Sequence, residues 1–302
     1  MRIFGKMIMA IALALVLSGT AAAGQKTFEK TFTVQPGGTL SLGTDVGSVA
    51  VRGTSSNEVS ISVVIHGSDR DVAKFDVSAN QSGNNVKVEG KMSGSGRWFW
   101  NSTDLEAEFT ISVPHNYSVT LNTSGGNITV EKLNGTVKGE TSGGSIHVAE
   151  IEGGINVETS GGDVSADVCT GNVHLGTSGG SIKASGIKGD LDAGTSGGNV
   201  SVADINGKVH AETSGGNVSV KVSGSPKSVY AETSGGNIEL VIPRSINATL
   251  DAETSGGSIQ CDLPVTVSGR IDEGSLKGKI NAGGELIHAH TSGGNVRIKA
   301  AE

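Results

Sequence analysis

Apolar and polar residues alternate along most of the chain in short runs with a period of two. In the stretch that begins at Thr195, Val200 and Val202 are separated by one polar residue, and Val209 and Ala211 follow in the same way. Alternation with this period is typical of a β-strand that has one buried face. After residue 23 no run of useful length has the 3.6-residue spacing of an amphipathic helix, so the pattern predicts strands throughout.

The four-residue motif Thr-Ser-Gly-Gly divides this pattern into repeats. A fixed period of this length predicts a solenoid, in which each repeat packs only on its neighbours. The Gly pairs supply tight turns. We therefore predict an all-β fold, a parallel β-solenoid with two short strands and about 18 residues per coil, right-handed as parallel crossovers prefer. The first five intervals are 18 residues each, and the motif begins at Thr123, Thr141, Thr159, Thr177, Thr195, Thr213, Thr233, Thr254 and Thr291.

The repeats predict three segments of different regularity. Residues 1–23 precede the fold, residues 24–122 form irregular β coils that cap one end, and residues 123–302 form the regular solenoid. Within the irregular part, residues 39–51 alternate as a degenerate first coil would. A cap is required because an uncovered end coil is an unpaired sheet edge. The long interval before Thr291 predicts one further degenerate coil around residues 271–282.

The first 23 residues are typical of a bacterial signal peptide. Arg2 and Lys6 make a short basic start before an apolar run at residues 7–17. Ala21 and Ala23 then stand in the arrangement that signal peptidase reads. The apolar run is shorter than the roughly 20 residues that span a bilayer, and no second run of spanning length follows. The prediction is an exported protein of the periplasm, the extracellular space or the cell surface, with no transmembrane segment in the mature chain.

The charge of the chain narrows the choice of partner. Without Arg2 and Lys6, 21 basic residues stand against 30 acidic ones, a formal net charge of −9. Nucleic acids and phospholipid surfaces require a positive patch, so neither is predicted as a partner. A solvated acidic surface that keeps an exported protein in solution accounts for the sign.

The position after each Gly pair decides between two interpretations of the turns. A calcium-binding roll of the same period needs a carboxylate in every such turn, and here only Asp163 is one. We therefore predict hydrogen-bonded ladders of Asn and Ser and no calcium. The residues concerned are Asn127, Ser145, Asp163, Ser181, Asn199, Asn217, Asn237, Ser258 and Asn295.

Two groups of histidines present the side chains that metals prefer. His174, Asp192 and His210 stand at equivalent outward positions of consecutive coils, whereas His288 and His290 share one strand face. A tight site needs closer convergence and a supporting second shell, so ion pairing is the preferred interpretation. We assign no metal-binding or cofactor-binding residue and predict no cofactor.

The chain lacks the patterns that are typical of an enzyme. No serine lies in a Gly-x-Ser-x-Gly elbow between a strand and a helix. A polysaccharide-processing β-helix needs clustered carboxylates, but the acidic residues here are spread along the coils. We assign no catalytic residue. Cys169 and Cys261 are expected about five coils apart, on the order of 20 Å, too far for a disulfide, and both are predicted to be small core residues.

One segment, Arg97, Trp98, Phe99 and Trp100, holds both tryptophans of a chain with few aromatics. Aromatic side chains in a loop rich in Gly, Ser and Asn are typical of a contact site for a sugar ring, a partner or a membrane interface. A hydrophobic plug over the first coil is the other interpretation. The sequence leaves both open.

The chain resembles a family of bacterial β-strand-repeat envelope proteins of unknown function, described as adhesins and related to the head domains of auto-transporter adhesins. The resemblance covers nearly all of residues 27–299. It implies a β-solenoid of the cell envelope and carries over no catalytic residue, since fold alone does not give function. It rests on the serial Thr-x-x-Gly-x-Ile/Val coils, on Phe32-Thr33-Val34 with Gly37-Gly38-Thr39-Leu40, and on Ile111-Ser112-Val113-Pro114.

Together these features predict a non-catalytic exported envelope protein, an adhesin-like binding or structural module that contacts a polymer or a protein. The expected partner is an envelope or extracellular polysaccharide, or an envelope protein, held by many weak polar contacts or by the aromatic segment. A regulatory scaffold that binds an envelope-stress signalling partner is the alternative. A polysaccharide-processing β-helix enzyme is a third. The sequence leaves the oligomeric state open.

Overall fold

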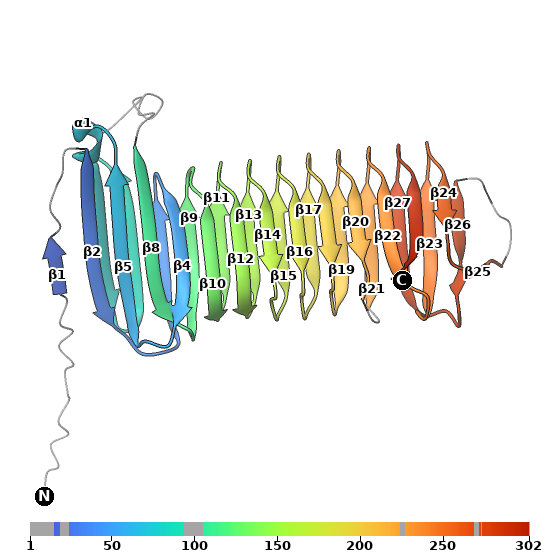
Figure 1. The fold of residues 1–302 in the computed structure, drawn as a ribbon, viewed down its shortest axis with the longest axis horizontal. Helices are drawn as coiled ribbons and strands as arrows, with labels where there is room; N and C mark the ends of the chain where they lie inside the picture. The colour runs from blue at the N-terminus through green and yellow to red at the C-terminus, as the bar shows by residue number, and fades with distance from the viewer. Residues whose placement is uncertain are drawn as a thin grey trace, which may run out of the picture.

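The computed structural model describes residues 15–18, 24–93, 105–223, 227–268, 272 and 274–301. In this part the chain forms an elongated stack of strands in two long sheets, with longer strands at its N-terminal end (Figure 1). The predicted fold class, an all-β parallel solenoid with two strands per coil, is confirmed. One short helix, α1 (Asp69–Val72), departs from the expectation of strands alone. No helix in these ranges is long and apolar enough to cross a membrane.

Each sheet has fourteen strands among the residues that the structure describes. In spatial order, sheet A consists of β1 (Leu15–Ser18), β2 (Gln25–Thr33), β5 (Glu58–His66), β8 (Glu106–Pro114), β4 (Ser48–Thr54), β10 (Ile128–Asn134), β12 (Ile146–Glu152), β14 (Val164–Asp167), β16 (Ile182–Ser185), β18 (Val200–Ala203), β20 (Val218–Lys221), β22 (Ile238–Pro243), β28 (Val296–Ala301) and β24 (Ile259–Cys261). Sheet B consists of β25 (Val265–Thr266), β26 (Ser275–Ile280), β23 (Ala248–Thr254), β27 (Glu285–Thr291), β21 (Ser228–Thr233), β19 (Lys208–Thr213), β17 (Leu191–Thr195), β15 (Val173–Thr177), β13 (Ile155–Thr159), β11 (Val137–Thr141), β9 (Tyr117–Thr123), β3 (Gly38–Thr44), β7 (Asn85–Met92) and β6 (Phe75–Ser82).

Equivalent residues of successive coils pair in parallel and in register. Val164 of β14 lies opposite Ile182 of β16, and Val173 of β15 lies opposite Leu191 of β17. The inward side chains therefore form apolar ladders that are almost wholly buried, since each is covered by the coils on both sides. Alternation along each strand leaves the intervening polar side chains on the outer faces.

The second glycine of each Thr-Ser-Gly-Gly motif is required by contact with the previous coil. A Cβ on Gly198 would lie 2.1 Å from the carbonyl oxygen of Gly180, and a Cβ on Gly180 would lie 2.0 Å from that of Gly162. No larger residue lets the coils stack at the strand spacing of about 4.8 Å. A Cβ on Gly194, in the same repeat, would meet nothing within 4 Å. The motif glycine is thus fixed by sterics, whereas Gly194 is not.

The threonine of the motif closes the same corner with hydrogen bonds. Thr195 Oγ1 donates to the carbonyl oxygen of Gly180 at 2.8 Å and accepts from the N–H of Gly198 at 3.4 Å. Beside it, the backbone N–H of Asn217 donates to Asn199 Oδ1 at 2.8 Å. The predicted side-chain ladders are confirmed. The buried corner threonines are Thr123, Thr141, Thr159, Thr177, Thr195, Thr213, Thr233, Thr254 and Thr291.

The first coil lies inside the stack rather than at its end. β3 pairs with both β7 and β9, and β4 pairs with both β8 and β10. Strands β5 to β8 therefore lie beyond the first coil, and β2–β5 and β6–β7 are antiparallel pairs. Lysines of β2 cap carbonyl oxygens of the edge strand β6, because Lys26 Nζ donates to Phe75 at 2.9 Å and Lys30 Nζ donates to Ala79 at 2.6 Å.

The last coil also lies inside the stack. β27 pairs in parallel with β21 and β23, and β28 pairs in parallel with β22 and β24, so the chain returns between coils that are already formed (Figure 1). Thr291 Oγ1 donates to Gly236 at 2.8 Å, and Thr254 Oγ1 donates to Gly294 at 2.7 Å. The corner ladder thus runs through the inserted coil without a break.

The prediction of one further parallel coil around residues 271–282 is wrong. β26 instead runs antiparallel to β23 and to β25. The repeat pattern could not reveal it, because every coil offers the same corner to its neighbour. The insertion also places Cys169 and Cys261 six strand steps apart along sheet A, counted from β14 to β24, rather than five coils, and both thiols are free.

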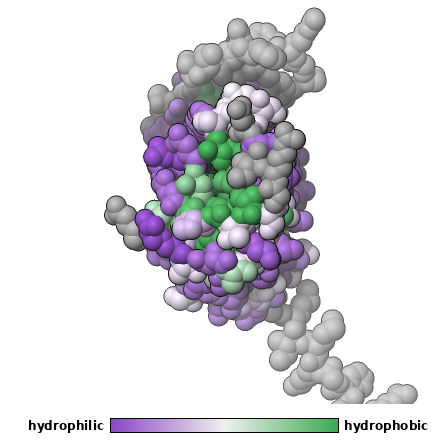
Figure 2. Space-filling view, turned by 90° about the vertical axis from the view of Figure 1, so that its right-hand side faces the viewer, coloured by the Kyte–Doolittle hydropathy of each residue, from purple (hydrophilic) through white to green (hydrophobic). Residues whose placement is uncertain are grey.

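The C-terminal end of the stack leaves part of its core ladder accessible. Figure 2 views this end and shows hydrophobic residues at the centre within a hydrophilic rim. Ile259, Cys261, Val265 and Leu276 are only partly buried here and pack against the core. The end strands are short: β24 has 3 residues and β25 has 2. Because β24 pairs with only the first three residues of β28, and β25 with only two residues of β26, part of each inner strand also lies at the sheet edge.

Candidate binding surface

The aromatic residues Arg97, Trp98, Phe99 and Trp100 lie outside the described residues, but both attachment points of their segment are described. On one side, the N–H of Met92 donates to Asp45 Oδ2 at 2.9 Å and the N–H of Ser93 donates to the carbonyl oxygen of Lys74 at 2.7 Å. On the other side, Leu105 is buried immediately before β8. The described residues on both sides of the segment therefore lie beside the turn between β3 and β4.

A polar groove of about 550 Å³ lies on one side of this turn, and we call it the serine groove. Corner serines of four successive motifs line it: Ser124, Ser142, Ser160 and Ser178. Four carboxylates face it as well: Asp45, Glu89, Glu140 and Glu158. The groove is rich in hydrogen-bond acceptors and carries negative charge, which excludes anionic ligands.

Lysines at the wall of the serine groove keep one of its carboxylates ionised. Lys91 Nζ donates to Glu89 Oε1 at 3.0 Å, and Lys87 Nζ lies 3.1 Å from the same oxygen. Hydrogen bonds from Lys91 and Lys87 lower the pKa of Glu89. Glu89 is thus an ionised hydrogen-bond acceptor, and Lys91 also lines the groove.

A second groove, of about 480 Å³, lies on the other side of the same turn, and we call it the Leu105 groove. It shares Asp45 and Ser124 with the serine groove. Val46, Leu105 and Ala107 give it an apolar part. The two grooves therefore meet at the root of the aromatic segment, and sequence reasoning missed them because residues far apart in the chain form both.

The predicted ion-pair ladder of histidines is confirmed on the outer face of sheet B. Asp192 accepts hydrogen bonds from both neighbours, with His174 Nδ1 and His210 Nδ1 each at 3.0 Å. Burial alone would raise the pKa of Asp192, but the hydrogen bonds from His210 and His174 outweigh it, so this pKa is lowered. The Nε2 atoms of the two histidines face separate carboxylates, Glu158 and Glu212.

The second predicted histidine pair continues the same row. β27 places His288 next to Tyr230 of β21, which is itself opposite His210. In the described part of the chain, no group of three or more His, Cys, Asp or Glu side chains stands in the arrangement of a bound metal. The sequence placed these histidines on one strand face but could not bring the two groups into one row, because that requires the inserted coil.

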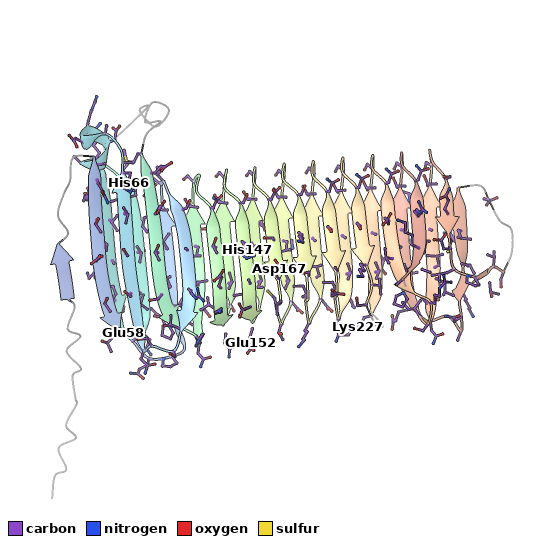
Figure 3. The ribbon with its side chains drawn as sticks, viewed as in Figure 1. Glu58, His66, His147, Glu152, Asp167 and Lys227 are labelled. Atoms are coloured by element: carbon purple, nitrogen blue, oxygen red, sulfur yellow. The ribbon has the colours of Figure 1, made fainter. Side chains whose placement is uncertain are left out.

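The outer face of sheet A carries smaller polar pairs. His147 Nδ1 lies 2.8 Å from Ser165 Oγ, and Ser185 Oγ donates to Asp167 Oδ1 at 2.5 Å. Figure 3 labels His147 and Asp167, which lie on the neighbouring strands β12 and β14. These pairs join one coil to the next and form no cluster comparable to the row on sheet B.

The fold and this surface define a capped parallel β-solenoid with polar outer faces and grooves at its motif corners. The chain belongs to the Toastrack DUF4097 family, whose model matches residues 40–299. The family resemblance predicted from the repeats is therefore confirmed. No curated protein matches the chain.

Several solved structures are similar to this chain at low identity. A candidate cell adhesion protein from Clostridium sporogenes is 17% identical, covers 91% of this chain and 100% of its own, and has a TM-score of 0.24. A candidate adhesin from Bacteroides fragilis is 15% identical over 91% and 97%, with a TM-score of 0.42. A candidate lipid-binding protein from Parabacteroides distasonis is 12% identical over 92% and 97%, with a TM-score of 0.39.

Proposed function

We propose that this protein is a non-catalytic, adhesin-like binding module of the bacterial envelope that contacts a polysaccharide at the root of its aromatic segment. The observation that carries the proposal is the meeting of the serine groove and the Leu105 groove at Asp45 and Ser124. Trp98 and Trp100 belong to the segment that joins the solenoid at this place. Export, directed by residues 1–23, would bring the module to the periplasm or the cell surface.

Sugar recognition supports this choice of ligand. Pyranose rings stack on aromatic side chains, while their hydroxyl groups bond to carboxylates and hydroxyls. The serine groove offers such acceptors at the strand spacing of about 4.8 Å, which suits an extended polymer that makes many weak contacts. Its carboxylates favour a neutral or amino-bearing polysaccharide over an acidic one.

The test is binding of the full chain to an array of envelope and extracellular polysaccharides. The double variant Trp98→Ala/Trp100→Ala should lose binding at least tenfold, because it removes the stacking faces. The variant Ser142→Gln/Ser160→Gln should also weaken binding, because the larger side chains fill the serine groove.

The repeat provides a matched control for the groove variant. Ser214 and Ser255 are exposed at the same motif position, and neither lines either groove. Ser214→Gln/Ser255→Gln should bind as the unaltered chain does. Equal binding by all variants, or no binding by the unaltered chain, would contradict the proposal. Capture of one stoichiometric envelope protein without polymer binding would favour the regulatory scaffold, and new reducing ends would indicate an enzyme.

A further inference from the structure

The N-terminal end of sheet A closes on a strand that belongs to the predicted signal peptide. β1 pairs antiparallel with β2 through four residues, and β2 pairs on its other side with β5 along its whole length (Figure 1). On export, as proposed for this protein, residues 1–23 are removed and β1 leaves with them. All nine residues of β2 then form the outer edge of sheet A.

The direction of the β2 backbone groups follows from the bonds on its β5 side. The N–H of Val34 donates to the carbonyl oxygen of Asn57 at 3.0 Å, and the N–H of Gly67 donates to that of Gly24 at 3.0 Å. Both bonds continue the β2–β5 register, and alternate residues of an antiparallel strand bond to opposite sides. The odd-numbered residues of β2 therefore direct their N–H and C=O groups outward. They are Gln25, Thr27, Glu29, Thr31 and Thr33.

The two lysines of β2 do not protect this edge. Charged side chains, lysine above all, commonly keep an edge strand from pairing with another chain. Lys26 and Lys30 instead turn toward sheet B, where their Nζ atoms donate to carbonyl oxygens of β6, and Lys30 Nζ lies 4.9 Å from the centre of the Phe32 ring. The lysines thus cap the edge of sheet B, whereas β1 covers the edge of sheet A.

The sequence of β2 is complementary to a second, antiparallel copy of itself. With a two-fold axis at Glu29, Lys26 faces Phe32 of the second copy and Phe28 faces its Lys30. Each lysine then lies beside an aromatic ring, which is a favourable cross-strand pair. An axis at Phe28 would place Lys26 opposite Lys30, and an axis at Lys30 would place that lysine opposite itself. Both arrangements are unfavourable.

We propose that the removal of residues 1–23 turns β2 into a pairing edge, through which two copies of the mature chain form a two-fold dimer with one continuous sheet A. Five outward residues on each copy give five pairs with two backbone hydrogen bonds each, about ten in all, as in a typical stable interface. In the uncleaved chain β1 pairs with Glu29 and Thr31, at the centre of this edge, and so excludes the second copy.

The residue on the axis is the weak point of the dimer and identifies its register. Glu29 is exposed and would face Glu29 of the second copy, although water and salt screen the repulsion between the two carboxylates. A lysine at this position would repel its own copy but would pair with Glu29 of an unaltered chain. Mixed dimers should therefore form in preference to either pure dimer. An axis elsewhere on β2 would set residue 29 opposite a different residue and remove this preference.

The first experiment is analytical ultracentrifugation of the protein purified after export from an expressing bacterium, with its N-terminus determined by mass spectrometry. The processed chain should be a dimer at micromolar concentrations, and the chain that keeps residues 1–23 should be a monomer. Thr31→Pro should raise the dissociation constant of the dimer at least tenfold. It removes an outward N–H and leaves the bonds to β5 in place, which is where an edge strand tolerates proline.

The second experiment mixes variants with the unaltered processed chain. Glu29→Lys should give mixed dimers in excess of the statistical proportion, and Glu29→Gln should tighten the pure dimer because it removes the like charges. Glu108→Lys is the matched control, since it makes the same change on an exposed residue of β8, two strands inside the edge. It should mix in statistical proportion.

Circular dichroism of each variant establishes that the solenoid is intact, and Glu29→Lys provides the test if Thr31→Pro does not fold. The proposal is overturned if the exported chain keeps residues 1–23, if the processed chain is a monomer, if Thr31→Pro folds and dimerises as before, or if Glu29→Lys mixes as Glu108→Lys does. Polysaccharide binding is measured separately. A monomer that binds the array overturns the dimer alone, and a dimer that binds no polymer overturns the proposed ligand alone.

Discussion

The corner glycine gives the sharpest test of how the coils are held together. In Gly198→Ala the new Cβ would lie 2.1 Å from the carbonyl oxygen of Gly180, which is backbone and cannot rotate away. A permitted contact of about 3.2 Å requires the two coils to separate by about 1 Å at this corner, about a fifth of the strand spacing. The substitution should therefore break the hydrogen bonds that join the two coils there.

Four hydrogen bonds cross this corner. Thr195 Oγ1 donates to Gly180 at 2.8 Å, and the N–H of Asn199 donates to Ser181 Oγ at 3.2 Å. Between backbone groups, the N–H of Ile182 donates to Asn199 at 2.8 Å and the N–H of Gly197 donates to Ser178 at 3.0 Å. Each contributes about 1 kcal/mol net. Gly198→Ala should therefore lower the free energy of unfolding by about 4 kcal/mol, measured by urea unfolding.

Gly194→Ala is the control in the same repeat, because its Cβ meets nothing within 4 Å. It should leave stability unchanged or raise it by up to about 1 kcal/mol, since alanine restricts the unfolded chain. Urea midpoints for the two variants that agree within the error of the measurement would refute the steric role of the corner glycine.

Three further substitutions test the hydrogen-bonded and titrating groups. Thr195→Val keeps the shape but removes a hydroxyl that serves two backbone groups, so urea unfolding should show a loss of about 1–3 kcal/mol. Burial would raise the pKa of Asp192, but hydrogen bonds from the two histidines lower it. The stabilisation from its ionised carboxylate is therefore present above about pH 4 and is lost as the pH falls through the folded pKa. Asp192→Asn should reduce this loss of stability at acid pH, measured by thermal unfolding. Burial raises the pKa of Tyr117 to about 12, so its stabilisation, complete below about pH 10, should be lost as the pH rises toward 12. In a Tyr230→Phe background, phenolate absorbance should follow Tyr117 alone, and Tyr117→Phe should remove the alkaline loss.

The sequence predicted the coil because the forces that define a coil are local and periodic. Val200 and Val202 alternate for the inner face, and Thr195 and Gly198 recur wherever two coils meet at the motif corner. The ladders of Asn199 and its equivalents follow from the same register. Each of these features can be derived from one repeat and its neighbour, so no knowledge of the whole chain is needed.

The grooves and the histidine row could not be predicted in this way. Asp45 and Ser124 meet because the first coil lies next to the coil of Thr123, although strands β5 to β8 separate the two coils in the chain. His288 meets Asp251 because the last coil enters between β21 and β23. Every coil offers nearly the same pairing surface to its neighbours, so several orders of the coils at the two ends are almost equivalent. The local sequence pattern therefore does not predict which order forms.

Backbone pairing of the last coil favours the inserted order at the C-terminal end. If the last coil stacked in chain order, β27 with 7 residues and β28 with 6 would form the open edges of the two sheets. With the coil inserted, β27 pairs with both β21 and β23, and β28 pairs with β22 and, over its first three residues, with β24, so both strands gain a second partner. The corner threonine can donate its hydrogen bond to the corner glycine of any neighbouring coil, so the ladder of corner hydrogen bonds continues through the inserted coil. The arrangement that gives both strands of the last coil a second partner also sets His288 and His290 between the carboxylate-bearing strands β21 and β23.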